Sequence, residues 1–217
     1  MIGDLLPDVV ATEVAYDDPP EARLEPAEEA VLTRAVDKRR REFTTVRHCA
    51  RAALARLGVP YRPLVPGLRG APSWPDGVVG SLTHCDGFRA AAVARAGALA
   101  SVGIDAEPAL PLPEGVLDVV ALPAEQKLLA ELTAAYPDTP WDRLLFSAKE
   151  SVYKAWFPLT GLFLEFSEAE LELSPDGTFT ARLLVPGPVV GGRRIDGFDG
   201  RWAVRDGLLA TTIAVAP

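Results

Sequence analysis

At the centre of the chain stands the segment Phe146-Ser147-Ala148-Lys149-Glu150-Ser151-Val152-Tyr153-Lys154-Ala155-Trp156. Apolar residues recur through it at helical spacing, which predicts a helix with one face against a core. The helix should begin at Thr139-Pro140-Trp141-Asp142, with Thr139 as its cap, and it should end at Pro158. We expect its buried stripe to consist of Leu144, Leu145, Ala148, Val152 and Trp156.

Glu150 and Lys154 lie four residues apart on this helix, so an ordinary surface ion pair is one interpretation. Aromatic and apolar neighbours, however, leave little of the helix truly polar. A partly buried glutamate beside Lys149 and Lys154 would remain ionised, and it would suit a metal ligand or a general base. Both interpretations stay open from these residues alone.

A second acidic element lies upstream, in Val102-Gly103-Ile104-Asp105-Ala106-Glu107. Side chains alternate along a strand, so Asp105 and Glu107 point to the same face. They either mark an exposed strand end or repel each other until a cation lies between them. Because the strand is apolar, we predict that it meets the helix and holds a divalent metal there. Oxygen ligands without a histidine cluster favour Mg²⁺, with Mn²⁺ as its substitute.

The remaining residues predict an α+β protein. Residues 1–25 look like a loosely structured lead-in, residues 26–57 are helical in one or two pieces, and residues 60–77 form a loop rich in proline and glycine. Further elements are expected as strands at 78–84, 88–94 and 101–106, a helix at 124–135, and strands between 170 and 215. Each half is a helix followed by strands, which predicts two similar lobes, 1–100 and 101–217.

The composition narrows the class of protein. The chain has 217 residues, 48% hydrophobic and 24% charged, as in an ordinary soluble domain. No apolar run is long enough for a membrane span, and the acidic, proline-broken start is unlike a signal peptide. Two cysteines are too few for a disulfide framework, so we expect a cytoplasmic protein. The net charge of −8 argues against a general nucleic-acid binder.

One basic segment departs from this acidic balance. It begins at Lys38-Arg39-Arg40-Arg41 and continues through Arg47 and Arg51. On a helix, Arg40, Arg47 and Arg51 should form a stripe, with Arg39 close to it. The stripe is either a solvated face or a site for phosphates or an acidic partner. The apolar face of the same helix should contain Phe43, Val46, Ala50, Ala53, Leu54 and Leu57.

The two histidines, His48 and His84, each precede a cysteine. Adjacent side chains diverge on both a helix and a strand, so neither dipeptide readily offers two ligands to one zinc ion. A serine hydrolase is disfavoured because no Gly-x-Ser-x-Gly elbow occurs. His84 at a strand end is either a core histidine or a donor to phosphate, aided by Thr83.

Three segments stand in a fixed order along the chain: Gly80-Ser81-Leu82-Thr83-His84, the strand Val102–Glu107, and the helical segment Phe146–Ala155. This ordered set resembles the motifs of 4′-phosphopantetheinyl transferases, of the large pseudodimeric type that serves siderophore, nonribosomal-peptide and polyketide assembly lines. The basic segment Lys38–Arg51 and Trp74-Pro75-Asp76-Gly77-Val78-Val79-Gly80 look especially like actinobacterial members. The resemblance implies a monomeric pseudodimer with its active site at the interface of two α/β lobes.

The resemblance also implies a reaction. Coenzyme A would donate its phosphopantetheine arm to a serine of an apo acyl or peptidyl carrier protein and release adenosine 3′,5′-bisphosphate. The pathway would be siderophore, polyketide, nonribosomal-peptide or fatty-acid biosynthesis, without a nucleic-acid or membrane partner.

Residue roles carry over by position. Asp105, Glu107 and Glu150 would bind Mg²⁺, and Asp105, Glu150 and Lys154 would be the catalytic residues that also touch coenzyme A. Glu150 would accept the serine proton, and Lys154 would stabilise the α-phosphate. The remaining coenzyme A contacts would be Arg39, Arg47, Thr83, His84 and Lys149. Many relatives have a lysine where this chain has Ala71, and we predict that Arg69 partly replaces it.

Two rival functions remain from the sequence. A Mg²⁺-dependent phosphohydrolase would use the same acids on coenzyme A or nucleotides without any carrier protein. A catalytically dead module would bind carrier proteins without turnover. The intact set of Asp105, Glu107, Glu150 and Lys154 argues against the second rival.

Overall fold

Two antiparallel sheets organise the protein, whose structure is a computed structural model that describes residues 1–217. The first sheet has the order β1-β3-β2. Its strands are β1 (Ala11–Ala15), β2 (Val78–Cys85) and β3 (Phe88–Arg95). The second sheet has the order β4-β10-β9-β6-β5. Its strands are β4 (Ser101–Pro108), β5 (Ala169–Ser174), β6 (Thr178–Leu183), β9 (Gly197–Arg205) and β10 (Leu208–Val215). A separate pair, β7 (Val189–Val190) and β8 (Arg193–Arg194), completes the strands.

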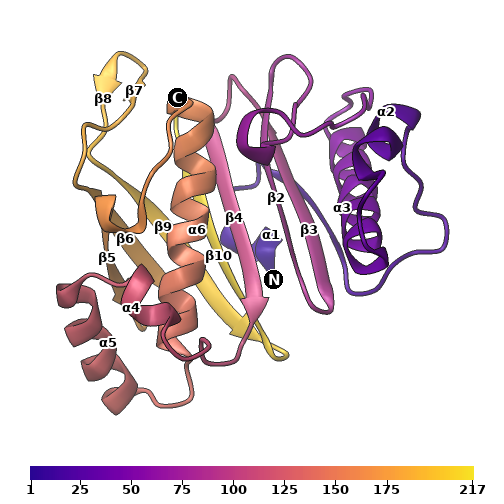
Figure 1. The fold of residues 1–217 in the computed structure, drawn as a ribbon. Helices are drawn as coiled ribbons and strands as arrows, with labels where there is room; N and C mark the ends of the chain where they lie inside the picture. The colour runs from indigo at the N-terminus through magenta and orange to yellow at the C-terminus, as the bar shows by residue number, and fades with distance from the viewer.

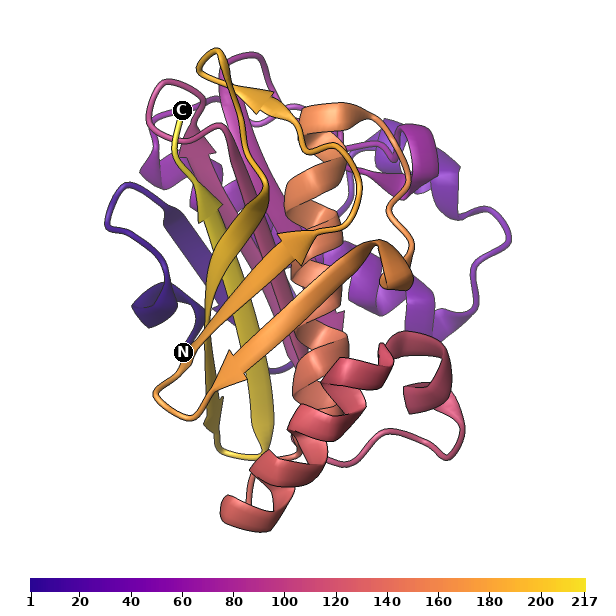
Figure 2. The same ribbon diagram turned by 90° about the vertical axis from the view of Figure 1, so that its left-hand side faces the viewer.

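The helices cover these sheets. The α-helices are α1 (Ile2–Leu5), α2 (Pro26–Glu29), α3 (Asp37–Arg56), α4 (Val116–Val120), α5 (Pro123–Ala135) and α6 (Trp141–Thr160), and the short 3₁₀ turns are η1 (Ala30–Leu32), η2 (Leu68–Gly70) and η3 (Phe166–Glu168). Helix α3 packs on the first sheet and α6 on the second, against β4 and β10 (Figure 1). Helix α1 lies on the face of the second sheet opposite α6 (Figure 2). The protein is therefore α+β with two sheet-rich lobes, as predicted.

The predicted apolar faces form the cores. All five predicted stripe residues of α6 are buried. The apolar residues predicted for the basic helix are also buried, except for Leu57, which directly follows α3 and is half-buried. Ile2 of α1, Phe88 of β3 and Ile104 of β4 belong to one buried cluster that spans both sheets. Because the two halves share this cluster, the lobe boundary between residues 100 and 101 stays a prediction.

The two sheets meet where β2 runs beside β4. The hydroxyls of Ser81 and Thr83 accept hydrogen bonds from the backbone N–H groups of Ile104 (3.1 Å) and Ala106 (3.0 Å). These side chains satisfy an edge of β4 that no strand pairs with. Gly103 allows α6 to lie close to β4, because a Cβ atom there would come within 2.0 Å of the Ser151 carbonyl oxygen. The seam consequently brings β2, β4 and α6 together.

Three local predictions were wrong. Residues 1–25 contain α1 and β1, and β1 pairs with β3 over residues 89–93. Helix α6 continues past Pro158 to Thr160, and Gly161 caps its end with a φ of 67°, which glycine adopts without strain. The residue before α6 is Pro140, and Thr139 provides no side-chain cap. A proline in the last turn removes only one helical hydrogen bond, which the packing of α6 on the sheet tolerates.

Candidate active site

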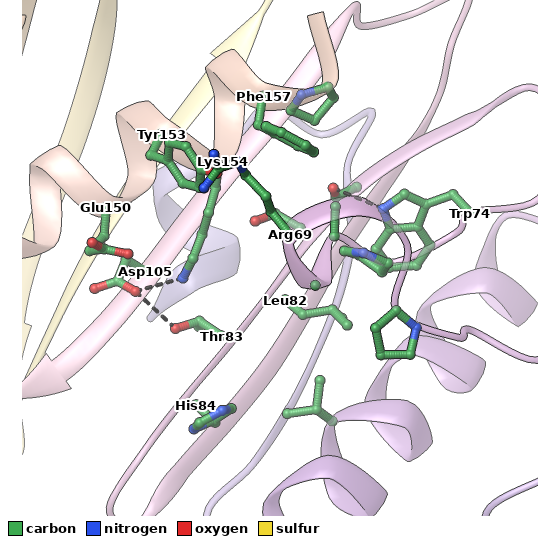
Figure 3. Close-up of a pocket in the computed structure, with 18 of the residues that line it drawn as sticks. Arg69, Trp74, Leu82, Thr83, His84, Asp105, Glu150, Tyr153, Lys154 and Phe157 are labelled. Carbon is green, nitrogen blue, oxygen red and sulfur yellow. Dashed lines mark hydrogen bonds and ion pairs between the residues drawn. The ribbon is translucent and has the colours of Figure 1, made fainter. Parts of the chain in front are cut away.

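A cavity of about 520 Å³ lies between the two lobes (Figure 3). Its walls come from α3, the loop that contains η2, β2, β4 and α6. It gathers residues from both halves of the chain that the sequence singled out: Arg39, Arg47, Arg69, Thr83, His84, Asp105, Glu150 and Lys154. Glu107 and Lys149 do not line it.

Asp105 is held by donors on several sides. Its Oδ1 accepts from Lys154 Nζ (2.7 Å) and Thr83 Oγ1 (3.3 Å), and its Oδ2 accepts from Ser147 Oγ (2.8 Å). Lys154 also donates to the carbonyl oxygen of Ile104 (3.1 Å). Lys154 thus pairs with Asp105, and the surface ion pair with Glu150 that helical spacing allows does not form.

Glu150 has no hydrogen bond or ion pair within the protein, although it is half-buried at the cavity wall. Burial raises the pKa of its carboxyl group, the Lys154 ammonium opposes this effect, and the charge of Asp105 adds to it. A carboxylate without a partner, close to a second carboxylate and open to a cavity, fits a divalent cation with oxygen ligands. Asp105 and Glu150 therefore offer carboxylate oxygens of the kind that Mg²⁺ prefers.

Glu107 points elsewhere. Its Oε2 accepts from Arg143 Nη1 (3.0 Å), and burial raises the pKa of its carboxyl group while Asp105 adds to the rise and Arg143 opposes it. Arg143 also donates to the carbonyl oxygens of Leu110 (3.0 Å) and Pro111 (2.8 Å), so it fixes the chain after β4 to α6. No three His, Cys, Asp or Glu side chains cluster tightly enough to hold a metal as they stand. The structure thus brings Asp105 and Glu150 to the cavity, but directs Glu107 to Arg143.

Arg143 is a residue that the sequence analysis missed. It lies seven residues before Glu150 on α6, which is nearly two helical turns, so both side chains fall on similar sides of the helix. This spacing is the sequence feature that places Arg143 on the same side of α6 as Glu150.

Arg39 and His84 form the cationic corner of the cavity. Arg39 Nη1 lies 2.8 Å from His84 Nε2, and because a guanidinium only donates, Nε2 must accept. The ring is then neutral with its proton on Nδ1, which lies 3.7 Å from a Glu42 carboxylate oxygen. Burial lowers the pKa of His84, in agreement with this neutral form. His84 is hence a cavity residue, not a core histidine.

Arg47 lies deeper on the same helix. Its guanidinium stacks 3.4 Å over the Phe43 ring and donates to the carbonyl oxygen of Leu64 (3.1 Å from Nη2). Burial lowers the pKa of Arg47 to about 10, which still leaves it charged at neutral pH. Arg40 and Arg51 pair with Glu29 and Glu25 instead. The predicted stripe therefore divides, and only Arg39 and Arg47 face the cavity.

The remaining wall is partly apolar. Trp74, Tyr153 and Phe157 line it, and Trp74 Nε1 donates to the Gly80 carbonyl oxygen (3.0 Å). Arg69 has its guanidinium 4.6 Å from the Phe163 ring centroid, and it lines the cavity together with Ala71. A cationic edge beside an aromatic wall suits a ligand with both phosphates and flat or alkyl parts.

Lys149 is directed away from the cavity. Its ammonium lies 2.8 Å from a Glu125 carboxylate oxygen and donates to the carbonyl oxygens of Phe166 (2.7 Å) and Ala169 (3.0 Å). Both partners of this ion pair are almost completely buried. Lys149 accordingly joins α6 to α5 and to the start of β5.

The cysteines and the helices bear on two further expectations from the sequence. Cys49 and Cys85 are both buried, and burial raises the pKa of each thiol to about 12. None of the helices combines the length and the apolarity that crossing a membrane demands.

Comparison with known proteins agrees with these features. The model of the 4′-phosphopantetheinyl transferase N-terminal domain matches residues 27–94, and that of the 4′-phosphopantetheinyl transferase superfamily matches residues 101–202. The chain is 67% identical over 220 residues to the 4′-phosphopantetheinyl transferase Svp of Streptomyces mobaraensis, which covers 100% of this chain and 89% of the relative. It is 50% identical over 225 residues to Npt of Nocardia iowensis (100% of both chains) and 47% identical over 225 residues to PptT of Mycobacterium tuberculosis (99% and 98%).

Proposed function

The chain belongs to the 4′-phosphopantetheinyl transferase superfamily, and we propose that the cavity between its lobes is the site where it binds and cleaves coenzyme A. The activity is that of a holo-carrier-protein synthase, which transfers phosphopantetheine from coenzyme A to a carrier protein. The meeting of Asp105, Glu150 and Lys154 with Arg39, Arg47 and His84 in one cavity is the observation that supports the proposed site. The phosphohydrolase and the catalytically dead module find no support among the relatives.

We propose that Asp105 and Glu150 hold Mg²⁺, or Mn²⁺ in its place, and that Glu107 joins them by exchanging Arg143 for the cation. When bound, the cation neutralises the negative charge that develops on the pyrophosphate. Glu150 is free of other partners, so it is able to take the proton of the attacking serine, directly or through water. Lys154 holds a positive charge at the cavity wall and stabilises the α-phosphate oxygens.

The second group of residues orients coenzyme A. Arg39 and Arg47 carry positive charge into the cavity and attract phosphate groups. Neutral His84 and Thr83 supply hydrogen-bonding groups beside them. Arg69 extends this set from the loop, at the position where Ala71 lacks a charge. Fixing the pyrophosphate in this way places its reacting phosphorus for attack, which supplies a large part of the rate.

The function is tested by mass spectrometry of an apo carrier protein incubated with the enzyme, coenzyme A and Mg²⁺. We expect the carrier to gain the mass of one phosphopantetheine unit, and a chelator to prevent the gain. A parallel reaction without carrier should leave coenzyme A intact. Consumption of coenzyme A in that reaction would instead indicate a phosphohydrolase, and no gain on any of several carriers would contradict transferase activity.

We further propose that the exposed basic end of α3 steers the carrier protein, because carriers are typically acidic around their serine. The Arg41 side chain is 59% exposed and does not line the cavity. Its Nε lies 3.4 Å from Asp18 Oδ2. Charge reversal in Arg41→Glu should raise the KM for the carrier several-fold at low salt, without changing the KM for coenzyme A.

The matched control for this prediction is Arg201→Glu. Arg201 is exposed on β9, which lies on the opposite side of the molecule from α3 (Figure 1). An equal effect of both reversals would indicate only the change in net charge. These assays do not test several other predictions: the natural carrier and its pathway, the monomeric state, the cytoplasmic location and the absence of nucleic-acid and membrane partners.

A further inference from the structure

Three buried hydroxyl groups form a chain behind Asp105. Ser147 Oγ lies 2.8 Å from Asp105 Oδ2, Thr211 Oγ1 lies 3.0 Å from Ser147 Oγ, and Ser151 Oγ lies 2.7 Å from Thr211 Oγ1. All three hydroxyl-bearing residues are completely buried, and none of them lines the cavity.

The hydrogen bond at the Asp105 end of this chain has a fixed direction. Each hydroxyl has a single proton to donate, and an ionised carboxylate only accepts. Ser147 must therefore donate to Asp105, and it cannot donate to Thr211 as well. Thr211 Oγ1 lies within hydrogen-bonding distance of three acceptors: Ser147 Oγ (3.0 Å), the Ser147 carbonyl oxygen (2.9 Å) and Ser151 Oγ (2.7 Å). Ser151 makes its shortest contact with Thr211. The hydrogen bond from Ser147 to Asp105 is consequently the contact of this chain whose direction is fixed.

The fold explains why these groups meet. Thr211 on β10 is the cross-strand partner of Asp105 on β4, so both side chains face α6. Ser147 and Ser151 are one helical turn apart on α6, and both contact Thr211. Gly103 lets α6 come close enough to the sheet for these contacts. The chain depends on one helix and two neighbouring strands.

The two oxygens of Asp105 thereby receive different environments. Oδ2 faces the buried hydroxyl chain, whereas Oδ1 faces Lys154 and Thr83, which line the cavity. The hydrogen bond from buried Ser147 fixes the orientation of the carboxylate, so Oδ1 stays turned towards the residues that line the cavity. Hydrogen bonds to a metal ligand from such a supporting shell set its orientation and its affinity.

We propose that Ser147, supported by Thr211 and Ser151, is a positioning residue that fixes Asp105 so that Oδ1 faces the divalent cation. The inference rests on the proposed role of Asp105 in holding Mg²⁺. It predicts that hydroxyls outside the cavity determine how tightly the enzyme binds the metal.

The test measures Mn²⁺ binding to the enzyme–coenzyme A complex by the loss of the free-ion EPR signal, with no carrier present and with coenzyme A at one concentration throughout. Ser147→Ala should weaken Mn²⁺ binding by about 10-fold or more. In the transfer assay it should raise the Mg²⁺ concentration needed for half-maximal rate, while saturating Mg²⁺ restores most of the rate. Thr211→Val, which keeps the shape but removes the hydroxyl, should change both quantities in the same direction and by less.

Two controls separate positioning from loss of packing. Thr211→Ser keeps the hydroxyl and should retain metal affinity. Ser101→Ala removes a buried hydroxyl that also joins β4 to α6, through the Ala155 carbonyl oxygen (2.8 Å), without touching Asp105. It should lower the melting temperature but leave Mn²⁺ binding unchanged.

The outcomes are distinguishable. Unchanged Mn²⁺ affinity in both Ser147→Ala and Thr211→Val, or an equal loss in Ser101→Ala, would overturn the positioning role alone. Thr211→Val also covers the case in which Ser147→Ala does not fold. A wild-type enzyme that transfers phosphopantetheine at full rate without any divalent cation would overturn the proposed metal role itself.

Discussion

Glu150→Gln is expected to abolish phosphopantetheine transfer while the protein stays folded. The substitution preserves the size of the side chain but removes the negative charge that we assign to the metal and to the serine proton. Loss of general-base function alone costs about 10²–10⁴-fold in rate, and loss of a metal ligand adds to it. The measurement is the initial rate of carrier modification by mass spectrometry at saturating Mg²⁺ and coenzyme A.

The stability of the same variant provides an independent check. Burial raises the pKa of Glu150, so between its ordinary value and the raised one the folded state binds more protons than the unfolded state. The free energy of unfolding of the wild type should therefore decrease as pH rises through this window. Glu150→Gln lacks this contribution, and at neutral pH it should melt at the same temperature as the wild type or higher.

An exposed glutamate provides the matched control. Glu131 on α5 is exposed and has no hydrogen-bond or ion-pair partner, so Glu131→Gln should leave both rate and melting temperature unchanged. If Glu150→Gln turned over at the wild-type rate, the assignment of the metal and of the base to Glu150 would be wrong. If it lost activity only by unfolding, the proposed chemical role would lose its support.

Periodicity and local turn signals predicted the parts of the fold that depend on near neighbours. The apolar stripe of α6 and the strands between residues 170 and 215 follow from such signals. Strand β1 was not predicted from such signals. All five of its side chains are half-buried, so its residues show no alternation between buried and exposed positions. It forms because β3 offers a free edge and α3 packs nearby. Pairing with a distant segment decided its structure.

The site shows the same limit at the level of single residues. The alternation of side chains along a strand placed Asp105 and Glu107 on one face. It did not predict that Glu107 would form an ion pair with Arg143. Helical spacing placed Lys154 near Glu150, whereas the structure pairs it with Asp105 from another element. Ion pairs between elements depend on how helix and sheet pack, and one sequence does not contain that geometry. Residue types and their order were predictable, and their partners were not.

Lys149→Met tests the partner that the structure gives to Lys149, and it is expected to have a large effect on stability. The Lys149–Glu125 pair is nearly inaccessible to water, and Glu125 also accepts from the backbone N–H groups of Leu122 (2.7 Å) and Leu171 (2.8 Å). Removing the ammonium leaves a buried carboxylate without its cation, which costs about 3–5 kcal/mol of unfolding free energy. The measurement is chemical denaturation, with Lys127→Met on the exposed side of α5 as the control of unchanged stability.

Restoring charge balance should recover much of this loss. In the double variant Glu125→Gln/Lys149→Met the amide oxygen still accepts from Leu171, the Leu122 N–H loses its acceptor, and no buried charge remains without a partner. Burial lowers the pKa of Lys149, and the hydrogen bond and charge of Glu125 oppose this effect. The double variant should thus unfold at a higher denaturant concentration than Lys149→Met alone.

The kinetic behaviour of Lys149→Met decides between the two roles of this lysine. Below its melting temperature, the variant should keep the wild-type KM for coenzyme A, because the ammonium of Lys149 points to Glu125 and the start of β5, not into the cavity. The resemblance to the transferases instead implied positive potential at the coenzyme A phosphates. A raised KM for coenzyme A with unchanged stability would establish that electrostatic role and reject the structural one. Lys154→Met, which removes a cation that does line the cavity, provides the comparison with impaired transfer.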